Sequence, residues 1–373
     1  MKKNPVGPLA GYRVIEFVGI GPGPYCGHLL AEMGAEVIMI DRPSKGPYMI
    51  DSRGKKSMIL DLRKPEGIEA ALKLIDTADA LIEGNRPGVA ERLGFGPEVC
   101  HKRNPKLVYG RMTGWGQEGP WSSMAGHDIN YLSITGFLHM TGKAGEPPMP
   151  PLNLAGDFGG GSMFLAMGML AAMLSAQKTG KGDIVDAAIV DGVSSMMGII
   201  NSLAGFGQWT PKREDNLLDG GAPFYRCYKT ADEKFMAVGC IEPQFFAIMM
   251  EKTGLSPEAY GDQNDKAKWP QQRELLESVF GSKTRDEWCA LFDGTDACIT
   301  PVLEMSEVQE HPHNKARGSH VRQGTMLHPQ MAPRLGSLEL SGPAPIPKRG
   351  TDTAELLKSV GCSGEVIQAL TQS

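Results

Sequence analysis

The first forty residues of this chain carry the pattern that most restricts its fold. Arg13–Gly19 is short and rich in β-branched residues, which predicts a strand, and Glu36–Asp41 predicts a second strand. Between them, the alternating glycines and prolines at 21–24 predict a turn, and Tyr25–Met33 predicts a helix. A strand, a helix and a second strand in succession form a βαβ unit, so we expect an α/β protein built on a parallel sheet.

The order of predicted strands and helices changes after about residue 220. Before it, strand candidates alternate with helix candidates. After it, Tyr225–Thr230 and Lys234–Cys240 flank Ala231-Asp232-Glu233, which is typical of a β-hairpin, and amphipathic helices follow. This change predicts a second, smaller α+β domain.

The domain boundaries are predicted from this change in pattern and from the length of 373 residues, which favours two domains. We expect a large α/β domain over 1–200, a linker over 201–219 and the smaller domain over 220–325. Residues 326–373 are expected to form a linker and C-terminal helices that return to the large domain.

Composition excludes several classes of protein. With 38 basic and 43 acidic side chains the net charge is −5, so no nucleic-acid partner is expected. The seven cysteines form no CxxC pair and are odd in number, which favours reduced thiols in the cytoplasm and no metal site. Met1–Pro5 is not followed by an apolar run, so no secretory signal is expected. No membrane span is expected either, because the most apolar stretch, Met163–Leu174, is too short to cross a bilayer.

Basic residues gather near the ends of predicted strands. Arg42 and Arg86 each follow a strand candidate, and Arg53, Lys55 and Lys56 are expected in a turn. The carboxyl ends of parallel strands line the ligand crevice, so together these residues suit a phosphate-bearing ligand. Taken singly, each is equally well explained as part of a solvated loop. A nicotinamide dinucleotide is not expected, because prolines interrupt the nearby glycine pattern.

Three residues carry candidate chemistry. His127 follows a glycine, Asp157 precedes three glycines and an apolar helix candidate, and Glu242 follows a predicted strand. A histidine and a carboxylate that share a cleft can remove a proton from one face of a carbon and return it to the other. Each residue also has a structural alternative: an inert buried histidine, a helix N-cap at Asp157, and a first-turn carboxylate at Glu242.

Three motifs resemble those of α-methylacyl-CoA racemases, which belong to the family III CoA-transferase superfamily. They are Arg111–Gln117, Gly126–Tyr131 and Asn153–Gly161, and the resemblance extends over nearly the whole chain. It implies a Rossmann-like, doubly wound large domain that binds coenzyme A, a smaller α+β domain, and two subunits interlocked as a homodimer. The sequence departs from the family in Ser44–Asp51 and in the C-terminal region.

The resemblance also implies roles for individual residues. His127 and Asp157 match the two catalytic bases, and Glu242 matches the acid that pairs with the histidine. The positions that match coenzyme A contacts are Arg42, Leu60, Asp61, Leu62, Arg63, Gly84, Asn85, Arg86, Arg92, Gly126, Asp128, Ile129, Asn130 and Tyr131.

The implied activity interconverts (2R)- and (2S)-2-methylacyl-CoA thioesters of fatty acids or sterol side chains by proton transfer through an enolate. We expect the backbone N–H of Asp157 to stabilise the enolate oxygen, and burial to raise the pKa of its carboxyl group. No metal or cofactor is expected, since coenzyme A is part of the substrate. One alternative is a CoA-transferase with a covalent aspartyl-CoA intermediate on Asp157, but that chemistry needs no base at His127. Another is a protein that binds acyl-CoA without chemistry.

Overall fold

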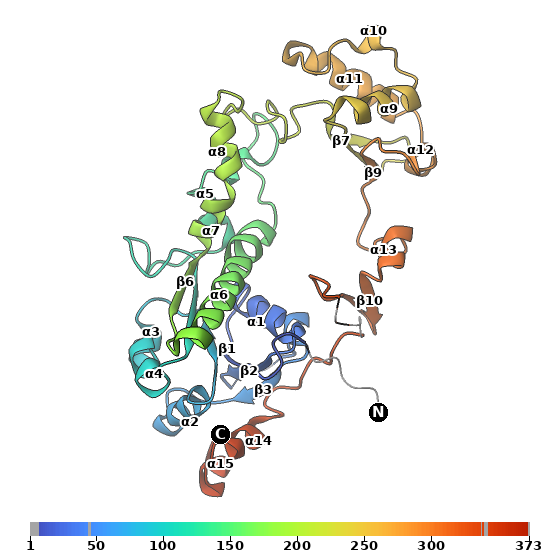
Figure 1. Ribbon diagram of the computed structural model, residues 1–373. Helices are drawn as coiled ribbons and strands as arrows, with labels where there is room; N and C mark the ends of the chain where they lie inside the picture. The colour runs from blue at the N-terminus through green and yellow to red at the C-terminus, as the bar shows by residue number, and fades with distance from the viewer. Residues whose placement is uncertain (1–6, 44–45, 337, 339–341, 372–373) are drawn as a thin grey trace. The chain divides into compact units, whose positions relative to one another are not determined.

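The computed structural model describes residues 7–43, 46–336, 338 and 342–371 (Figure 1). Predictions for Met1–Pro5 and for the first two residues of Ser44–Asp51 lie outside this range. The chain divides into two compact units, each described here by itself. The first unit comprises residues 1–135, 151–196 and 315–373, and the second comprises 136–150 and 197–314.

A six-stranded, fully parallel sheet forms the centre of the first unit, in the order β3-β2-β1-β4-β5-β6. The parallel α/β sheet predicted from the sequence is thereby confirmed. Because β1 has β2 on one side and β4 on the other, the strand order reverses here, and this switch point is where such sheets bind ligands. The strands are β1 (Arg13–Phe17), β2 (Glu36–Asp41), β3 (Lys56–Ile59), β4 (Ala80–Glu83), β5 (Val108–Thr113) and β6 (Ile184–Ala188).

Helices cover the sheet, and its central strands are buried on both faces, as expected for a parallel sheet. One apolar core joins Ile15, Ile38 and Leu81 of the strands to Leu72 and Leu356 of helices that lie far apart in the sequence. The helices of this unit are α1 (Pro22–Glu32), η1 (Ile50–Ser52), α2 (Pro65–Ile75), α3 (Val89–Leu93), α4 (Pro97–Arg103), α5 (Asp128–Ser133), η3 (Leu154–Met163), α6 (Phe164–Thr179), α7 (Ile189–Met196), α14 (Thr353–Ser359) and α15 (Gly364–Thr371).

The C-terminal segment closes the edge of the sheet at β3. Ser57 N–H donates to Asp352 Oδ2 at 2.7 Å, and Ile59 N–H donates to Thr353 Oγ1 at 3.1 Å. These bonds satisfy backbone groups that an edge strand would otherwise expose. The strand itself corrects one expectation, since Lys56 begins β3 and does not lie in a turn. A hairpin that the sequence did not predict, β10 (His320–Gln323) and β11 (Met326–Pro329), also belongs to this unit.

The helix that carries Asp157 is longer than predicted. The π-helical segment η3 runs directly into α6, whereas the pattern predicted a helix only over Ser162–Lys178. By length and apolar composition alone, this stretch of 26 residues passes the test for a membrane-crossing helix, and no other stretch within the described ranges does. The expectation that the apolar stretch is too short is therefore wrong. A Cβ added to Gly110 of β5 would lie 2.8 Å from Met169 Sδ and 3.1 Å from Leu165 Cδ1, so α6 packs directly on the sheet.

The second unit is built on a three-stranded antiparallel sheet in the order β7-β8-β9. Its first two strands confirm the predicted hairpin. The sheet packs with its helices around an apolar core that includes Phe224, Leu276 and Trp288. The elements are η2 (Leu138–Met140), α8 (Gly198–Gly205), β7 (Tyr225–Lys229), β8 (Phe235–Gly239), α9 (Pro243–Thr253), α10 (Pro257–Tyr260), η4 (Lys266–Lys268), α11 (Trp269–Phe280), α12 (Arg285–Phe292) and β9 (Ile299–Pro301), with α13 (Pro312–Arg317) at the boundary.

The division into units differs from the expected boundaries in three places. Residues 197–219, expected as the end of the large domain and a linker, belong to the second unit. Residues 136–150, expected within 1–200, belong to the second unit, because the Arg213 guanidinium donates to the carbonyl oxygens of His139, Lys143 and Glu146. The first unit also resumes at residue 315, ten residues before the expected end of the smaller domain.

Candidate active site

The loop after β1 approaches the carboxylate of Asp157. Gly21 ends this loop with φ of +74°, a conformation that favours glycine, and a Cβ added to it would lie 3.2 Å from Asp157 Oδ2. The fully buried Ser162 hydroxyl supports this approach, since it donates to the Pro22 carbonyl oxygen at 2.8 Å and lies 3.2 Å from the carbonyl oxygen of Asp157. Asp157 therefore faces the carboxyl end of β1, at the switch point of the sheet.

His127 is held by the start of α5. It is the N-cap residue of that helix, and its backbone N–H donates to Asn130 Oδ1 at 3.0 Å. The carbonyl oxygen of Gly126, directly before it, accepts a short hydrogen bond from the Tyr131 hydroxyl. The imidazole itself is exposed. The backbone of His127 is thus fixed while its side chain remains accessible.

The Tyr131 ring fits between two glycines of the recognised motifs. A Cβ added to Gly114 would lie 2.0 Å from this ring, and one added to Gly126 would lie 2.7 Å from it. The Trp115 ring meets Tyr131 edge-on, with centroids 4.7 Å apart. These two glycines are therefore required by packing beside the histidine.

The environment of Asp157 suits a group that must gain and lose a proton. Burial raises the pKa of its carboxyl group, in agreement with the expected effect, while the Asn153 side chain and the charge of His127 oppose the rise. Asn153 Nδ2 donates to Asp157 Oδ2 at 3.2 Å. Asp128, which directly follows His127 in the chain, accepts the backbone N–H of Asp157 at 2.7 Å, so the two segments lie side by side. The structure thus brings together the two segments that carry the predicted bases, while the roles of His127 and Asp157 stay a prediction.

The expected oxyanion donor is already engaged. The backbone N–H of Asp157 donates to Asp128 Oδ1 at 2.7 Å. Asp157 is also not a helix N-cap, since η3 begins three residues before it. The prediction that this N–H is a free donor for an enolate oxygen is therefore wrong in this structure.

Three arginines predicted to contact coenzyme A are exposed near the switch point. Arg42 follows β2 and Arg86 follows β4, the two neighbours of β1, and Arg92 belongs to α3. Burial raises the pKa of Tyr131, and the charge of Arg86 opposes part of that rise. The role of the three arginines in binding coenzyme A stays a prediction.

In the segment after β3, residues 60–63, fewer side chains are free to contact a ligand than expected. Leu60 is buried in the core, and Leu62 packs against it. Arg63 forms a bidentate pair with Asp61, at 2.9 and 3.0 Å, which lowers the pKa of Asp61 to about 2. After β4, Gly84 is exposed, and the Asn85 N–H donates to a Glu83 carboxylate oxygen at 2.7 Å. The role of these positions in binding coenzyme A stays a prediction.

Two members of the predicted basic cluster face inward. Arg53 is 2% exposed and pairs with Glu32 at 2.5 Å. Lys55 is fully buried, with its Nζ 2.7 Å from Glu16 Oε2. These cations are neutralised by internal carboxylates, so they cannot serve a phosphate group, and that part of the prediction is wrong. Lys56 is partly exposed but pairs with Glu36 at 2.7 Å.

Sequence reasoning missed Arg349, which reaches the carboxyl end of β2 from the C-terminal segment. Its guanidinium forms a short ion pair with Asp41 and lies 4.2 Å from the centre of the Tyr48 ring. No local pattern marks this residue, because its partners lie about 300 positions earlier in the chain.

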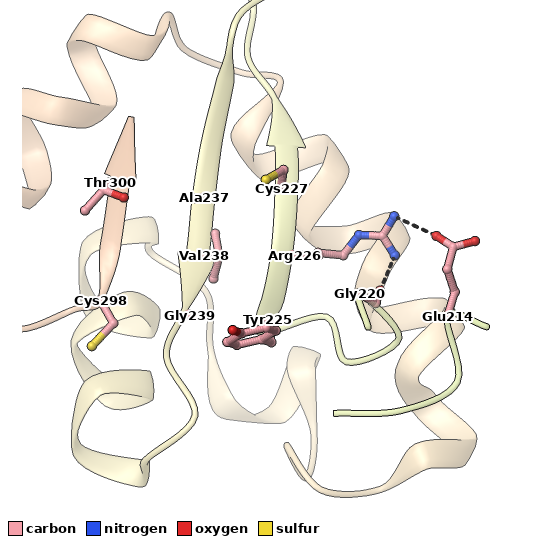
Figure 2. Close-up of a pocket in the computed structure, with 10 residues that line it drawn as sticks. All are labelled: Glu214, Gly220, Tyr225, Arg226, Cys227, Ala237, Val238, Gly239, Cys298 and Thr300. Atoms are coloured by element: carbon pink, nitrogen blue, oxygen red, sulfur yellow. Dashed lines mark hydrogen bonds and ion pairs between the residues drawn. The ribbon is translucent and has the colours of Figure 1, made fainter. Parts of the chain in front are cut away.

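Glu242 belongs to the second unit, where it is exposed at the N-cap of α9. Its charge raises the pKa of the Cys298 thiol, after the larger effect of burial. Its pairing with His127 stays a prediction. Beside Cys298, an open hollow of about 620 Å³ lies over the sheet of this unit (Figure 2). Arg226 at its rim is engaged by Glu214 at 3.7 Å and by the Gly220 carbonyl oxygen at 3.0 Å.

Comparison with known proteins finds relatives that match over nearly the whole chain. The α-methylacyl-CoA racemase of Mus musculus is 43% identical over 364 residues, which cover 97% of this chain and 96% of the relative. The racemase of Homo sapiens is 43% identical over 368 residues, with the same coverage. A solved structure of a CAIB/BAIF family protein from Brucella suis matches with a TM-score of 0.82 at 25% identity, over 95% of this chain and 100% of that one.

The family model described as CoA-transferase family III matches residues 9–353, which include the sheet, His127, Asp157 and Glu242. By this match and by the shared fold, the chain belongs to the family III CoA-transferases.

Proposed function

We propose that this protein is a racemase that interconverts (2R)- and (2S)-2-methylacyl-CoA thioesters. The observation that carries the proposal is that the Asp128 carboxylate, next to His127, holds the backbone N–H of Asp157 at 2.7 Å, which places the two candidate bases on adjoining segments. Burial also raises the pKa of the Asp157 carboxyl group. The similarity to two racemases over nearly the whole chain supports the same reaction. A CoA-transferase would use the aspartate as a nucleophile and would leave the neighbouring histidine without a role.

The thioester carbonyl acidifies the α-proton but leaves it a very weak acid, so two positioned bases and a stabilised enolate are required. In one direction neutral His127 removes the proton, and protonated Asp157 delivers one to the opposite face. In the other direction the ionised Asp157 removes the proton and the imidazolium delivers one. The pair therefore holds one proton before and after each turnover, but on a different one of the two residues.

Exposed arginines support a place for the coenzyme A part of the substrate. Arg42, Arg86 and Arg92 are proposed to bind the phosphate groups of coenzyme A, since exposed guanidinium groups at strand ends suit phosphates. Glu242 is proposed to pair with His127 and to assist its proton transfer. The proposed reaction moves only protons, so it calls for no redox cofactor.

We also propose that two copies associate as an interlocked homodimer. Met163, Met167 and Leu174 are 51%, 61% and 60% exposed and recur on one side of the continuous helix formed by η3 and α6. An exposed apolar stripe of this kind favours burial against a partner. A monomeric mass in light scattering at micromolar concentration would exclude the dimer.

Incubation with a single epimer in deuterated water tests the reaction. We expect deuterium to enter the α-position while the other epimer accumulates, because each base exchanges its proton with solvent. Neither exchange nor epimerisation in the same sample would contradict the proposal. Hydroxylamine trapping of an acyl-enzyme would instead support a transferase with a covalent intermediate on Asp157.

The pH dependence of the reaction should show the raised pKa of Asp157. Both directions need the pair to hold one proton, and lowering the pH through the pKa of Asp157 protonates both groups, so neither can act as a base. Since burial raises this pKa, the acid limb of kcat/KM should lie above the ordinary value of 3.8, and for both epimers. Profiles measured from each epimer check this, and an acid limb at or below 3.8 would contradict it.

A further inference from the structure

Asp128 links the two catalytic candidates through one carboxylate. It follows His127 directly in the chain, and its Oδ1 accepts the backbone N–H of Asp157 at 2.7 Å. Burial raises the pKa of this carboxyl group, and the backbone N–H groups of Asp157 and Gly156 beside it oppose the rise. The residue is only 9% exposed, so its side chain faces the protein and not a ligand. The carboxylate therefore spans 29 positions of sequence between the two segments that carry the bases.

Glycine at position 156 makes this contact possible. A Cβ there would lie 2.2 Å from Asp128 Oδ1 and 2.8 Å from its Cγ, distances that no real side chain could tolerate. The carboxylate thus lies directly against the backbone before Asp157. Hydrogen bonds from backbone N–H groups to an ionised carboxylate are among the stronger ones in proteins, so the contact is well suited to fixing that backbone.

His127 has separate supports that do not involve this carboxylate. Its N–H donates to Asn130 Oδ1, and the preceding carbonyl oxygen accepts from Tyr131. Within the described part of the chain, α5 is hydrogen-bonded to the segment of Asp157 through Asp128 alone. Loss of the Asp128 carboxylate should therefore disturb Asp157 more than His127.

We propose that Asp128 is a positioning residue for Asp157: its carboxylate fixes the Gly156–Asp157 backbone relative to His127, so that the two bases stay on opposite faces of one α-carbon. The inference rests on the proposed racemase function. It also replaces the expected coenzyme A contact of the Asp128 side chain with an internal one. A base displaced by about 1 Å can lose about 100-fold in rate, so even a small shift of Asp157 would be measurable.

The test is exchange of the α-proton with deuterated water, measured separately from each epimer in Asp128→Asn. Asparagine keeps one side-chain oxygen that can accept a hydrogen bond from a backbone N–H. It replaces the second carboxylate oxygen with an NH2 group, which cannot accept one. The epimer that Asp157 deprotonates is the one whose exchange is lost in Asp157→Ala. We expect Asp128→Asn to slow exchange of that epimer by about 100-fold and exchange of the other epimer much less, with coenzyme A binding unchanged.

The controls separate this inference from a general structural defect. Asp183→Ala removes an exposed aspartate whose Oδ1 accepts a backbone N–H at 2.8 Å, and it should change neither exchange rate. Gly156→Ala disturbs the same contact from its other side, and it serves if Asp128→Asn does not fold. An equal loss for both epimers overturns the positioning role while leaving the racemase function in place. Absence of exchange in the unaltered protein overturns both.

Discussion

Alanine in place of His127 or Asp157 is expected to lower epimerisation of a 2-methylacyl-CoA thioester by about 10²–10⁴-fold, the usual contribution of a general acid or base. Each variant keeps one base, but a proton removed from one face can no longer be delivered to the other. Binding of coenzyme A should survive, because neither side chain is proposed to hold it. Initial rates of epimerisation and calorimetric titration with coenzyme A measure the two effects.

Matched variants show whether the loss is specific. His313→Ala removes another exposed histidine, on α13, and Asp183→Ala removes an exposed aspartate of the first unit. Neither is expected to alter the rate. Near-normal turnover in His127→Ala or Asp157→Ala would remove that residue from the mechanism.

Gly192→Ala is expected to give the second large effect, a loss of stability together with activity. A Cβ at position 192 of α7 would lie 1.9 Å from the carbonyl oxygen of Gly160 in η3, and backbone atoms cannot rotate away as a side chain can. Overpacking of this kind costs about 1–3 kcal/mol or more of the free energy of unfolding. Because η3 carries Asp157, the shift should also slow the reaction. Thermal denaturation and initial rates measure both losses.

The matched control for this substitution is Gly198→Ala. Gly198 also lies in a helix, α8, but a Cβ added to it meets nothing within 4 Å. Alanine there should leave stability unchanged or raise it by a few tenths to about 1 kcal/mol, because it restricts the unfolded chain. An unchanged melting temperature in Gly192→Ala would show that α7 and η3 are not packed as described.

The sheet could be predicted because its signals are local. The strands at Arg13–Gly19 and Glu36–Asp41 are recognisable from β-branched, apolar residues, and the prolines and glycines between them mark the turn. β3 was missed because its four residues begin with a lysine whose pairing with Glu36 depends on a neighbouring strand. The burial of Arg53 and Lys55 could not be predicted either, because each is neutralised by a carboxylate more than 20 positions away in the sequence.

The motifs were enough to propose His127 and Asp157 as the two bases, but they did not predict where the neighbouring side chains point. The sequence placed Asp128 and Tyr131 among the coenzyme A contacts, whereas in the structure their polar atoms bond to the backbone beside the two bases. The Asp157 N–H, expected to be a free donor, is the partner of that same Asp128. Which partner a polar group finds depends on tertiary packing that spacing alone does not encode.

Solvent exchange of each epimer, compared between His127→Ala and Asp157→Ala, tests the central claim most directly. If the two bases stand on opposite faces of one carbon, each variant should lose epimerisation yet still exchange the α-proton of one epimer, and the two variants should retain opposite epimers. If both variants exchange the same epimer, the two residues do not divide the faces of the carbon between them, and the two-base account is wrong.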